Sequence, residues 1–394
     1  MTKTSPLLNT ILEKNSAYFK EILSSENHLV QIIYTRIDRD KKNKPAFTDY
    51  FYQLNDQHYF YPASTVKFPI AVLALHRLNE LNIPGLDKYT TMITGAAFAG
   101  QTEVYNDPTS PDGRPCIAQY IKKIFLVSDN DASNRLYEFL GQEYINTTLQ
   151  KMGFTSVQIL HRLNVSMSDE EHRNTNPVKF YDSAGKILYE KPAQKSHLKY
   201  ANRSIKMGVG YISEGKLVNK PFDFSTKNRI TLTDLHLLLK SVMFPESVPE
   251  KMRFHLTEDD RKFLWKYMSM YATESVYPSY TPPGYWPAYS KFLFYGTEKT
   301  DPQPGIRIFN KIGSAYGFLT DVAYIVDFEN KIEFMLSATI YCNSDGIFND
   351  DKYDYDTVGY PFLKNIGRAI YQHELALKKK PVPDLSTFYF HYKN

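Results

Sequence analysis

The alternation of apolar and polar residues predicts strands near both ends of the chain and helices between them. An amphipathic segment over residues 8–23 precedes a β-branched apolar run at 29–35. The charged stretch at 38–45 is typical of a hairpin loop and leads into a second strand at 49–54. The other predicted strands lie at residues 307–310, 321–328 and 331–341. Strands at both ends indicate one sheet assembled from both parts of the chain, an α/β or α+β plan.

Residues 68–75 form a nearly continuous apolar run with little periodicity, which predicts a helix buried on most sides. Pro69 fits only near the start of such a helix, because further along it removes a backbone hydrogen bond. Thr231 or Thr233 is a suitable cap for a later helix that runs to residue 239, and Thr257 for the next one. Further helices are expected at residues 117–127, 132–140, 257–271 and 358–377.

Two segments lack a clear period. The segment from residue 153 to 229 is long, polar and weakly periodic, and loops of this length are usually functional or disordered. Residues 277–295 hold eight aromatic residues and four prolines, so this segment either lines a groove or packs as a surface loop.

Composition supports a well-packed globular protein of one large domain or two lobes: 394 residues, 42% hydrophobic and 23% charged. The net charge of +4 is small, and the basic runs at 41–44 and 378–380 are short. They are interpreted as a turn and a solvated tail. We therefore expect no nucleic-acid partner.

The cysteines and the targeting signals give little information about function. Cys116 and Cys342 form one bridge or none, and no metal-ligand spacing is present, so neither a metal site nor a cofactor is expected. No apolar stretch reaches the ~20 residues that cross a bilayer, and the N-terminus lacks the apolar region of a signal peptide. The protein is therefore either cytoplasmic or had a targeting segment removed.

The first candidate chemistry is a serine and a lysine three residues apart, Ser64 and Lys67, where an irregular segment meets the buried helix. Residues at this spacing share one helix face. A lysine in a dry pocket has a lowered pKa and can take the proton of a serine nucleophile. A free backbone N–H beside Ser64 can bind an oxyanion. The alternative is a serine that caps a core helix beside a solvated lysine.

Two further groups follow in the chain. At Ser128-Asp129-Asn130 the sequence changes abruptly from apolar to hydroxyl, carboxylate and amide side chains, a pattern that also fits a simple cap of the helix at 132–140. Lys311-Ile312-Gly313-Ser314 then stands at a strand. Serine–lysine, serine–aspartate–asparagine and lysine–x–glycine groups in this order are a set known from serine enzymes that form acyl intermediates.

With these three groups the chain resembles the class A β-lactamase-like serine hydrolases, which have the β-lactamase and penicillin-binding-protein transpeptidase fold. Further similarities extend the resemblance over about residues 29–371, at residues 152–153, 162–164, 231–235 and 317–325. The implied fold has an antiparallel sheet lobe, residues 1–63 and 225–394, flanked by helices. An all-helical lobe, residues 64–224, would carry the nucleophile, the Ser128 group and an enlarged omega-like loop.

The resemblance implies four catalytic residues. Ser64 attacks a carbonyl carbon to form an acyl-enzyme, with Lys67 as base or proton relay. Ser128 passes a proton to the leaving amine, and Lys311 supplies positive charge beside Ser128 and the substrate carboxylate.

The resemblance also implies oxyanion and substrate-binding residues. The N–H groups of Ser64 and Ser314 form the oxyanion hole. Asn130 holds the amide side chain of the substrate and orients Lys67, and Gly313 belongs to the same substrate-binding strand.

The sequence departs from the family at two places. Ile312 stands where the family carries Thr or Ser, which helps to bind the substrate carboxylate. In the omega loop, the position of the glutamate that activates the deacylating water falls near Met167, which is not a base. Glu170 and Glu171 follow shortly after, either as the water-activating residue or as solvated loop charges.

We therefore expect a serine hydrolase that acts through an acyl-enzyme on Ser64, first of all on β-lactam or related amide bonds. The alternatives are a D-alanyl-D-alanine peptidase or penicillin-binding protein, and a β-lactam-acylated sensor with little turnover. The substrate would be a small molecule or a peptidoglycan fragment, and the location periplasmic or otherwise extracytoplasmic.

Overall fold

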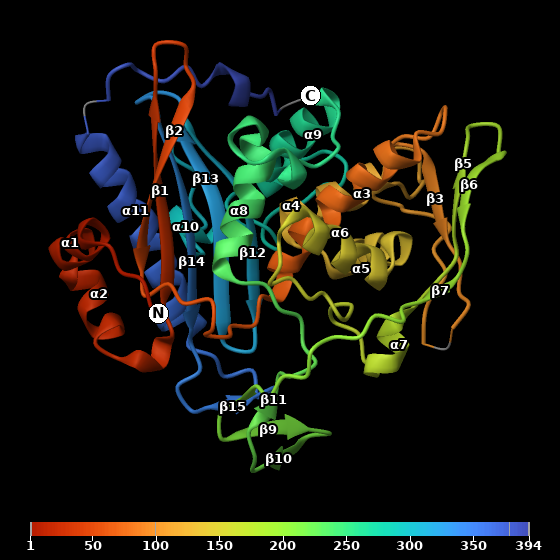
Figure 1. Cartoon of the computed structure of the whole chain (residues 1–394), viewed down its shortest axis with the longest axis horizontal. Helices are drawn as coiled ribbons and strands as arrows, with labels where there is room; N and C mark the ends of the chain where they lie inside the picture. The colour runs from red at the N-terminus through yellow and green to blue at the C-terminus, as the bar shows by residue number, and fades with distance from the viewer. Residues whose placement is uncertain (1, 99, 378, 393–394) are drawn as a thin grey trace.

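The computed structural model describes residues 2–98, 100–377 and 379–392. Its centre is a five-stranded antiparallel sheet in the order β12-β13-β14-β1-β2, built from both parts of the chain (Figure 1). The strands are β1 (Gln31–Arg39), β2 (Pro45–Tyr52), β12 (Ile306–Ala315), β13 (Phe318–Asp327) and β14 (Ile332–Tyr341). The predicted mixed α/β class with an antiparallel sheet is confirmed.

Helices from both chain ends cover one face of the sheet (Figure 1). They are α1 (Pro6–Lys14), α2 (Ser16–Leu23) and α11 (Tyr360–Ala376). The predicted amphipathic segment breaks into two helices at Asn15, whose side-chain amide donates to the carbonyl of Ile11. Their apolar faces pack with the sheet in one cluster that includes Leu8, Phe19 and Phe362.

The opposite face packs against α8 (Leu232–Met243) and, through a larger cluster, against the helices of the middle of the chain. Thr231 caps α8, and Thr257 caps α9 (Glu258–Ser269) in a capping box with Asp260. The middle helices are α3 (Lys67–Leu81), α4 (Ile117–Val127), α5 (Asn130–Leu140) and α6 (Gln142–Met152).

Helix α3 is the buried helix that the apolar run predicts. A 3-10 turn, η2 (Ala63–Val66), leads into it, and every side chain of α3 from Lys67 to Leu75 is buried. Pro69 lies in the first turn, where its missing N–H costs no helical hydrogen bond. The helix contacts both α4 and α5 and ends at Leu81, followed by Asn82 in the left-handed region.

The middle of the chain is not helical throughout, which corrects the expectation of an all-helical lobe. It holds short strands: β3 (Thr91–Thr94), β4 (Asn174–Thr175), β5 (Val178–Tyr181), β6 (Ile187–Lys191), β7 (Gln194–Lys195), β8 (Lys206–Met207), β9 (Gly210–Ser213), β10 (Lys216–Val218) and β11 (Phe222–Asp223). Strands β8, β10 and β11 hold no buried side chain, so they leave no alternating pattern in the sequence, whereas β3 and β5 bury every second side chain but are only four residues long. The lobe boundaries at 63/64 and 224/225 stay a prediction, and residues 1, 393 and 394 of the expected sheet lobe lie outside the described residues.

Residues 277–287 of the aromatic segment lie mostly at the surface, while the part from Ala288 through the short helix α10 (Phe292–Tyr295) packs largely in the core. Ala288 and Lys291 are buried in it, and Ser290 donates to the carbonyl of Leu126. Cys116 and Cys342 are both free. Lys378 of the expected basic tail lies outside the described residues. Among the helices that are described, none has the length and apolar character to cross a bilayer.

Candidate active site

Ser64, Asn130 and Ser314 line one cavity of about 790 Å³. Ser64 lies in η2, Asn130 begins α5, and Ser314 lies near the end of β12. Two further segments close the cavity, residues 161–167 with His172, and residues 349–355 of the β14–α11 connection. Three groups that are far apart in the sequence therefore meet at one place.

Hydrogen bonds join four predicted catalytic and substrate-binding residues beside Ser64. Lys67 Nζ contacts the Ser128 carbonyl and lies 2.6 Å from Asn130 Oδ1 and 3.3 Å from Ser128 Oγ. Lys311 Nζ reaches the same Ser128 hydroxyl at 2.7 Å and the carbonyl of Ile312 at 2.8 Å. We call Ser64, Lys67, Ser128, Asn130 and Lys311 the motif wall. Ser64 and Asn130 line the cavity, and the other three are joined to Asn130 or to one another by hydrogen bonds.

The electrostatics of the motif wall favour a neutral amine. Burial lowers the pKa of Lys67 to about 7, against a smaller opposite effect of Asp129. Burial also holds the pKa of Lys311 well below its usual range, and the neighbouring Lys67 lowers it further. A neutral Lys67 has two N–H groups for the Ser128 and Asn130 oxygens, which leaves its lone pair free to accept a proton.

Ser128 acquires its position from the junction of two helices. It ends α4 in the left-handed region, with a φ of 60°, and its N–H donates to the carbonyl of Ile124. Asp129 then begins α5, because its carboxylate accepts from the N–H of Ala132 at 2.7 Å. The capping alternative for this group is thus correct for Asp129, while Ser128 and Asn130 face the site. A non-glycine residue in this conformation costs energy and is common at functional sites.

Gly313 allows β12 to lie directly against the turn that carries Ser64. A Cβ atom at this position would stand 2.6 Å from the Pro62 carbonyl oxygen and 3.1 Å from the Thr65 nitrogen. β12 is an outer strand of the sheet, so one of its edges is free for contacts other than strand pairing. Only glycine leaves room for Ser314 and Ser64 to line the same cavity.

Ile312 points away from this cavity. Its side chain is 6% exposed and packs in the cluster between the sheet and α11. The strand alternation that turns Lys311 toward Ser128 turns Ile312 to the other face. The cavity therefore receives no hydroxyl from position 312.

Glu170 and Glu171 are not brought to Ser64. Both lie on the short helix α7 (Asp169–Arg173), outside the lining of the cavity. Glu170 is paired with Lys195, and Glu171 accepts from the backbone N–H of Ser168 in a capping box. Spacing along the sequence could not show that both carboxylates are occupied elsewhere.

Residues 161–167 and His172 form what we call the loop wall. Its two histidines, His161 and His172, were not predicted from the sequence. His161 Nδ1 lies 2.6 Å from the carbonyl of Arg162, and its Nε2 accepts from the N–H of Asn228. His172 Nδ1 accepts from the N–H of Arg162 at 3.3 Å. Burial lowers the pKa of His161 to about 4 and that of His172 to about 3, so both are neutral near pH 7.

A buried ion pair holds the loop wall to α5. Arg162 Nε lies 2.7 Å from Glu138 Oε1, and its Nη2 donates to the carbonyl of Asn174. Glu138 in turn accepts from the N–H of Asn176. Of the described residues that line the cavity, Asp351 is the one with a carboxylate, and it comes from the β14–α11 connection. No local sequence signal marks any of these residues.

Comparison with known proteins agrees with this architecture. The model of the beta-lactamase enzyme family matches residues 16–374. A beta lactamase structure from Xanthomonas campestris is similar with 13% identity and a TM-score of 0.51, covering 91% of this chain and 98% of that one. A beta-lactamase from Burkholderia phymatum covers 92% and 99% (14% identity, TM-score 0.49), and PBP-A covers 96% and 100% (16% identity, TM-score 0.48). A search of the curated proteins found no match.

The family match defines a hydrolase of the serine beta-lactamase kind, and the fold is similar to that of a solved beta lactamase. The chain belongs to the beta-lactamase enzyme family, which implies a small-molecule substrate.

Proposed function

We propose that the protein is a serine hydrolase that reacts with β-lactams or related amides by forming an acyl-enzyme on Ser64. The observation that carries the proposal is the shared Ser128 hydroxyl, which lies within hydrogen-bonding distance of both Lys67 and Lys311 beside the cavity of Ser64. This arrangement supplies a base and a proton relay at one place.

The proposed reaction conserves protons. Ser64 Oγ bonds to the substrate carbonyl carbon while its proton passes to the neutral amine of Lys67. The Ser64 and Ser314 N–H groups bind the developing oxyanion. When the C–N bond breaks, Ser128 donates its proton to the leaving nitrogen and takes one from Lys67, which returns to its starting state. The product is an ester of Ser64.

Slow release of the acyl group is the second part of the proposal. Hydrolysis of the ester needs a base to activate water. Glu170 and Glu171 point elsewhere, and the two histidines of the loop wall have their accepting nitrogens occupied by backbone N–H groups. Asp351 approaches from another segment. These observations favour an acyl-enzyme that is hydrolysed more slowly than it is formed.

A chromogenic cephalosporin with intact-protein mass spectrometry tests the proposal, with Ser64→Ala as the control. We expect a mass increase of the wild-type protein and complete loss of it in Ser64→Ala, because the alanine lacks the nucleophile. Equal, background-level reactivity of the two proteins would refute the proposal.

A D-alanyl-D-alanine peptidase, or a sensor that is acylated without turnover, is the second candidate. It is favoured by Ile312, which brings no carboxylate-binding hydroxyl to the cavity, and by the positions of Glu170 and Glu171. Release of D-alanine from a muropeptide would identify the peptidase, and a stable penicillin adduct without such release would identify the sensor. An extracytoplasmic location is part of both candidates, and cell fractionation tests it.

A further inference from the structure

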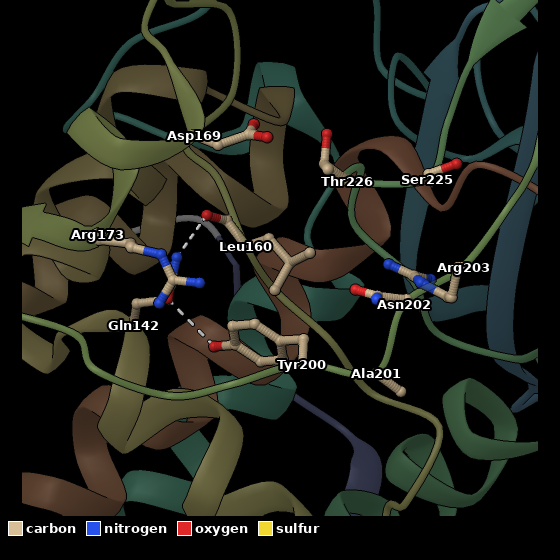
Figure 2. A pocket seen from close by; sticks show the side chains of 10 residues that line it. All are labelled: Gln142, Leu160, Asp169, Arg173, Tyr200, Ala201, Asn202, Arg203, Ser225 and Thr226. Carbon is tan, nitrogen blue, oxygen red and sulfur yellow. Dashed lines mark hydrogen bonds between the residues drawn. The ribbon is translucent and has the colours of Figure 1, made fainter.

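A second cavity, of about 230 Å³, lies beyond the loop wall and has a guanidinium group on each side (Figure 2). Arg173 comes from α7 and Arg203 from the segment that leads into β8. Figure 2 shows one guanidinium group at each side of the lining, with Leu160 and Asn202 drawn between them in this view. The other lining residues are Gln142, Leu160, Asp169, Tyr200, Ala201, Asn202, Ser225 and Thr226.

Arg203 is held in place with unused donors. Its Nη2 donates to the carbonyl of Lys227 at 3.1 Å, while Nε and Nη1 are buried and have no hydrogen-bond partner among the described residues. Burial lowers the pKa of Arg203, and the nearby Arg229 lowers it further, against an opposite effect of Tyr59. Buried donors without acceptors are costly, and a small movement of this guanidinium toward an oxygen ligand in the cavity would relieve that cost.

Arg173 is also fixed without a carboxylate. Its Nη1 donates to the carbonyls of Ser196 and Leu198, and its Cζ lies 5.6 Å from the centre of the Tyr200 ring. Throughout the described residues, neither Arg173 nor Arg203 has a carboxylate within ion-pairing distance, and Glu170 of the same helix pairs with Lys195. Two arginines that are positioned by backbone carbonyls thus present free positive charge to the cavity.

The remaining polar groups limit the ligand. The Tyr200 hydroxyl is engaged by Gln142 and Asn146, so it shapes the cavity without an unmet bond. Asp169 carries the single carboxylate of the lining, which leaves a net positive charge against the two arginines. The volume is below the ~300 Å³ of pockets for drug-sized ligands. A small, singly charged ligand fits both limits.

We propose that the cavity between Arg173 and Arg203 binds a small oxyanion, the carboxylate or phosphate of a metabolite. We further propose that this binding changes the rate at which Ser64 reacts in the serine cavity. The two cavities share a wall. Leu160 faces the arginines while the next residues face Ser64, and the carbonyl that fixes Arg203 belongs to Lys227, which lines the serine cavity. The binding goes beyond the proposed reaction and does not depend on it, whereas the coupling rests on the proposed acylation of Ser64.

Isothermal titration calorimetry of the full chain tests the binding, with inorganic phosphate and acetate as separate probes and sodium chloride at equal ionic strength as the reference. We expect one of the two oxyanions to bind with 1:1 stoichiometry. Arg203→Gln should weaken this binding by about tenfold or more, because a charged donor pair is lost. Arg253→Gln removes an arginine that pairs with Glu246 elsewhere, and it should bind as the wild type does.

The titrations are repeated in the Ser64→Ala variant, so that binding is measured where no acyl-enzyme forms. Circular dichroism verifies that Arg203→Gln is folded, and Arg173→Gln gives a second, independent loss of binding. The proposal is overturned if neither probe binds beyond the chloride reference, or if both arginine variants bind with wild-type affinity. The probe that binds should also change the rate of cephalosporin adduct formation at Ser64 in the wild-type protein, and an unchanged rate would refute the coupling.

Discussion

The motif wall and the loop wall of the serine cavity differ in the number of side chains that are available for proton transfer. In the motif wall, Lys67 and Lys311 meet at one hydroxyl with distances of 3.3 and 2.7 Å. In the loop wall, the carboxylate of Glu138 is occupied by Arg162, and His172 accepts from the backbone. The motif wall holds groups that can transfer protons, whereas the polar groups of the loop wall are occupied by structural hydrogen bonds and an ion pair.

This contrast separates the two halves of an acyl-transfer cycle. Acylation needs a base close to the nucleophile, and deacylation needs a base that reaches a water molecule. A protein can keep the first half and lose the second, because the two halves depend on different segments of chain. The following experiments test the contrast, beginning with the largest expected effect.

Lys67→Met should slow acylation of Ser64 by roughly 10²–10⁴-fold, the usual contribution of a general base. The wild-type acylation rate should rise with pH through about 7, because the neutral amine is the active form and burial lowers the pKa of Lys67 to about 7. Stopped-flow measurement of adduct formation between pH 5 and 9 checks both. A rate in Lys67→Met with the same pH profile as the wild type would assign the base elsewhere.

Gly313→Ala should slow acylation by about 10- to 100-fold and lower the melting temperature. The new methyl group meets the Pro62 carbonyl oxygen at 2.6 Å, and such overpacking costs about 1–3 kcal/mol. Adduct formation and thermal unfolding are measured together. Gly113→Ala is the matched control for the added methyl group, since nothing lies within 4 Å of the added Cβ at that turn, although its positive φ adds some strain.

A carboxylate added to the loop wall should speed release of the acyl group by about tenfold, equivalent to ~1.4 kcal/mol of barrier. Asn164→Glu and Met167→Glu each place one in the lining of the cavity. The half-life of the Ser64 adduct is followed by mass spectrometry, with Asn164→Gln and Met167→Gln as uncharged controls. Adducts that persist equally in all four variants would show that another feature limits release.

Glu170→Gln and Glu171→Gln should leave the adduct half-life unchanged, because these side chains pair with Lys195 and cap α7. The measurement is the same mass-spectrometric decay. A longer half-life in either variant would mean that α7 moves its carboxylate to the cavity during the reaction, and would remove the contrast between the walls.

Much of the architecture follows from local patterns. The apolar run at 68–75 lies in a fully buried stretch of α3, and the strands at both ends form one sheet. The strands in the middle of the chain could not be predicted from the pattern, because β8 to β11 are two to four residues long and bury few side chains. A strand without a buried face leaves no period in the sequence.

The candidate site divides in the same way. Ser64 and Lys67 are three residues apart where a 3-10 turn leads into α3, so their proximity is a local property that spacing predicts, while the contacts of Lys67 with Ser128 and Asn130 depend on the fold. The roles of Glu170 and Glu171 depend on which way a short surface helix turns them, and spacing cannot settle that.

The sequence by itself supplied the candidate reactive groups and their order, because the three short groups at Ser64, Ser128 and Lys311 are recognised by their resemblance to a known family without any knowledge of their positions in space. Tertiary structure alone decided that one Ser128 hydroxyl lies between two buried lysines, that Gly313 lets β12 touch the Ser64 turn, and that Arg173 and Arg203 line one cavity. The physical reason is that pKa values, close approach and unpaired charge depend on neighbours from distant parts of the chain.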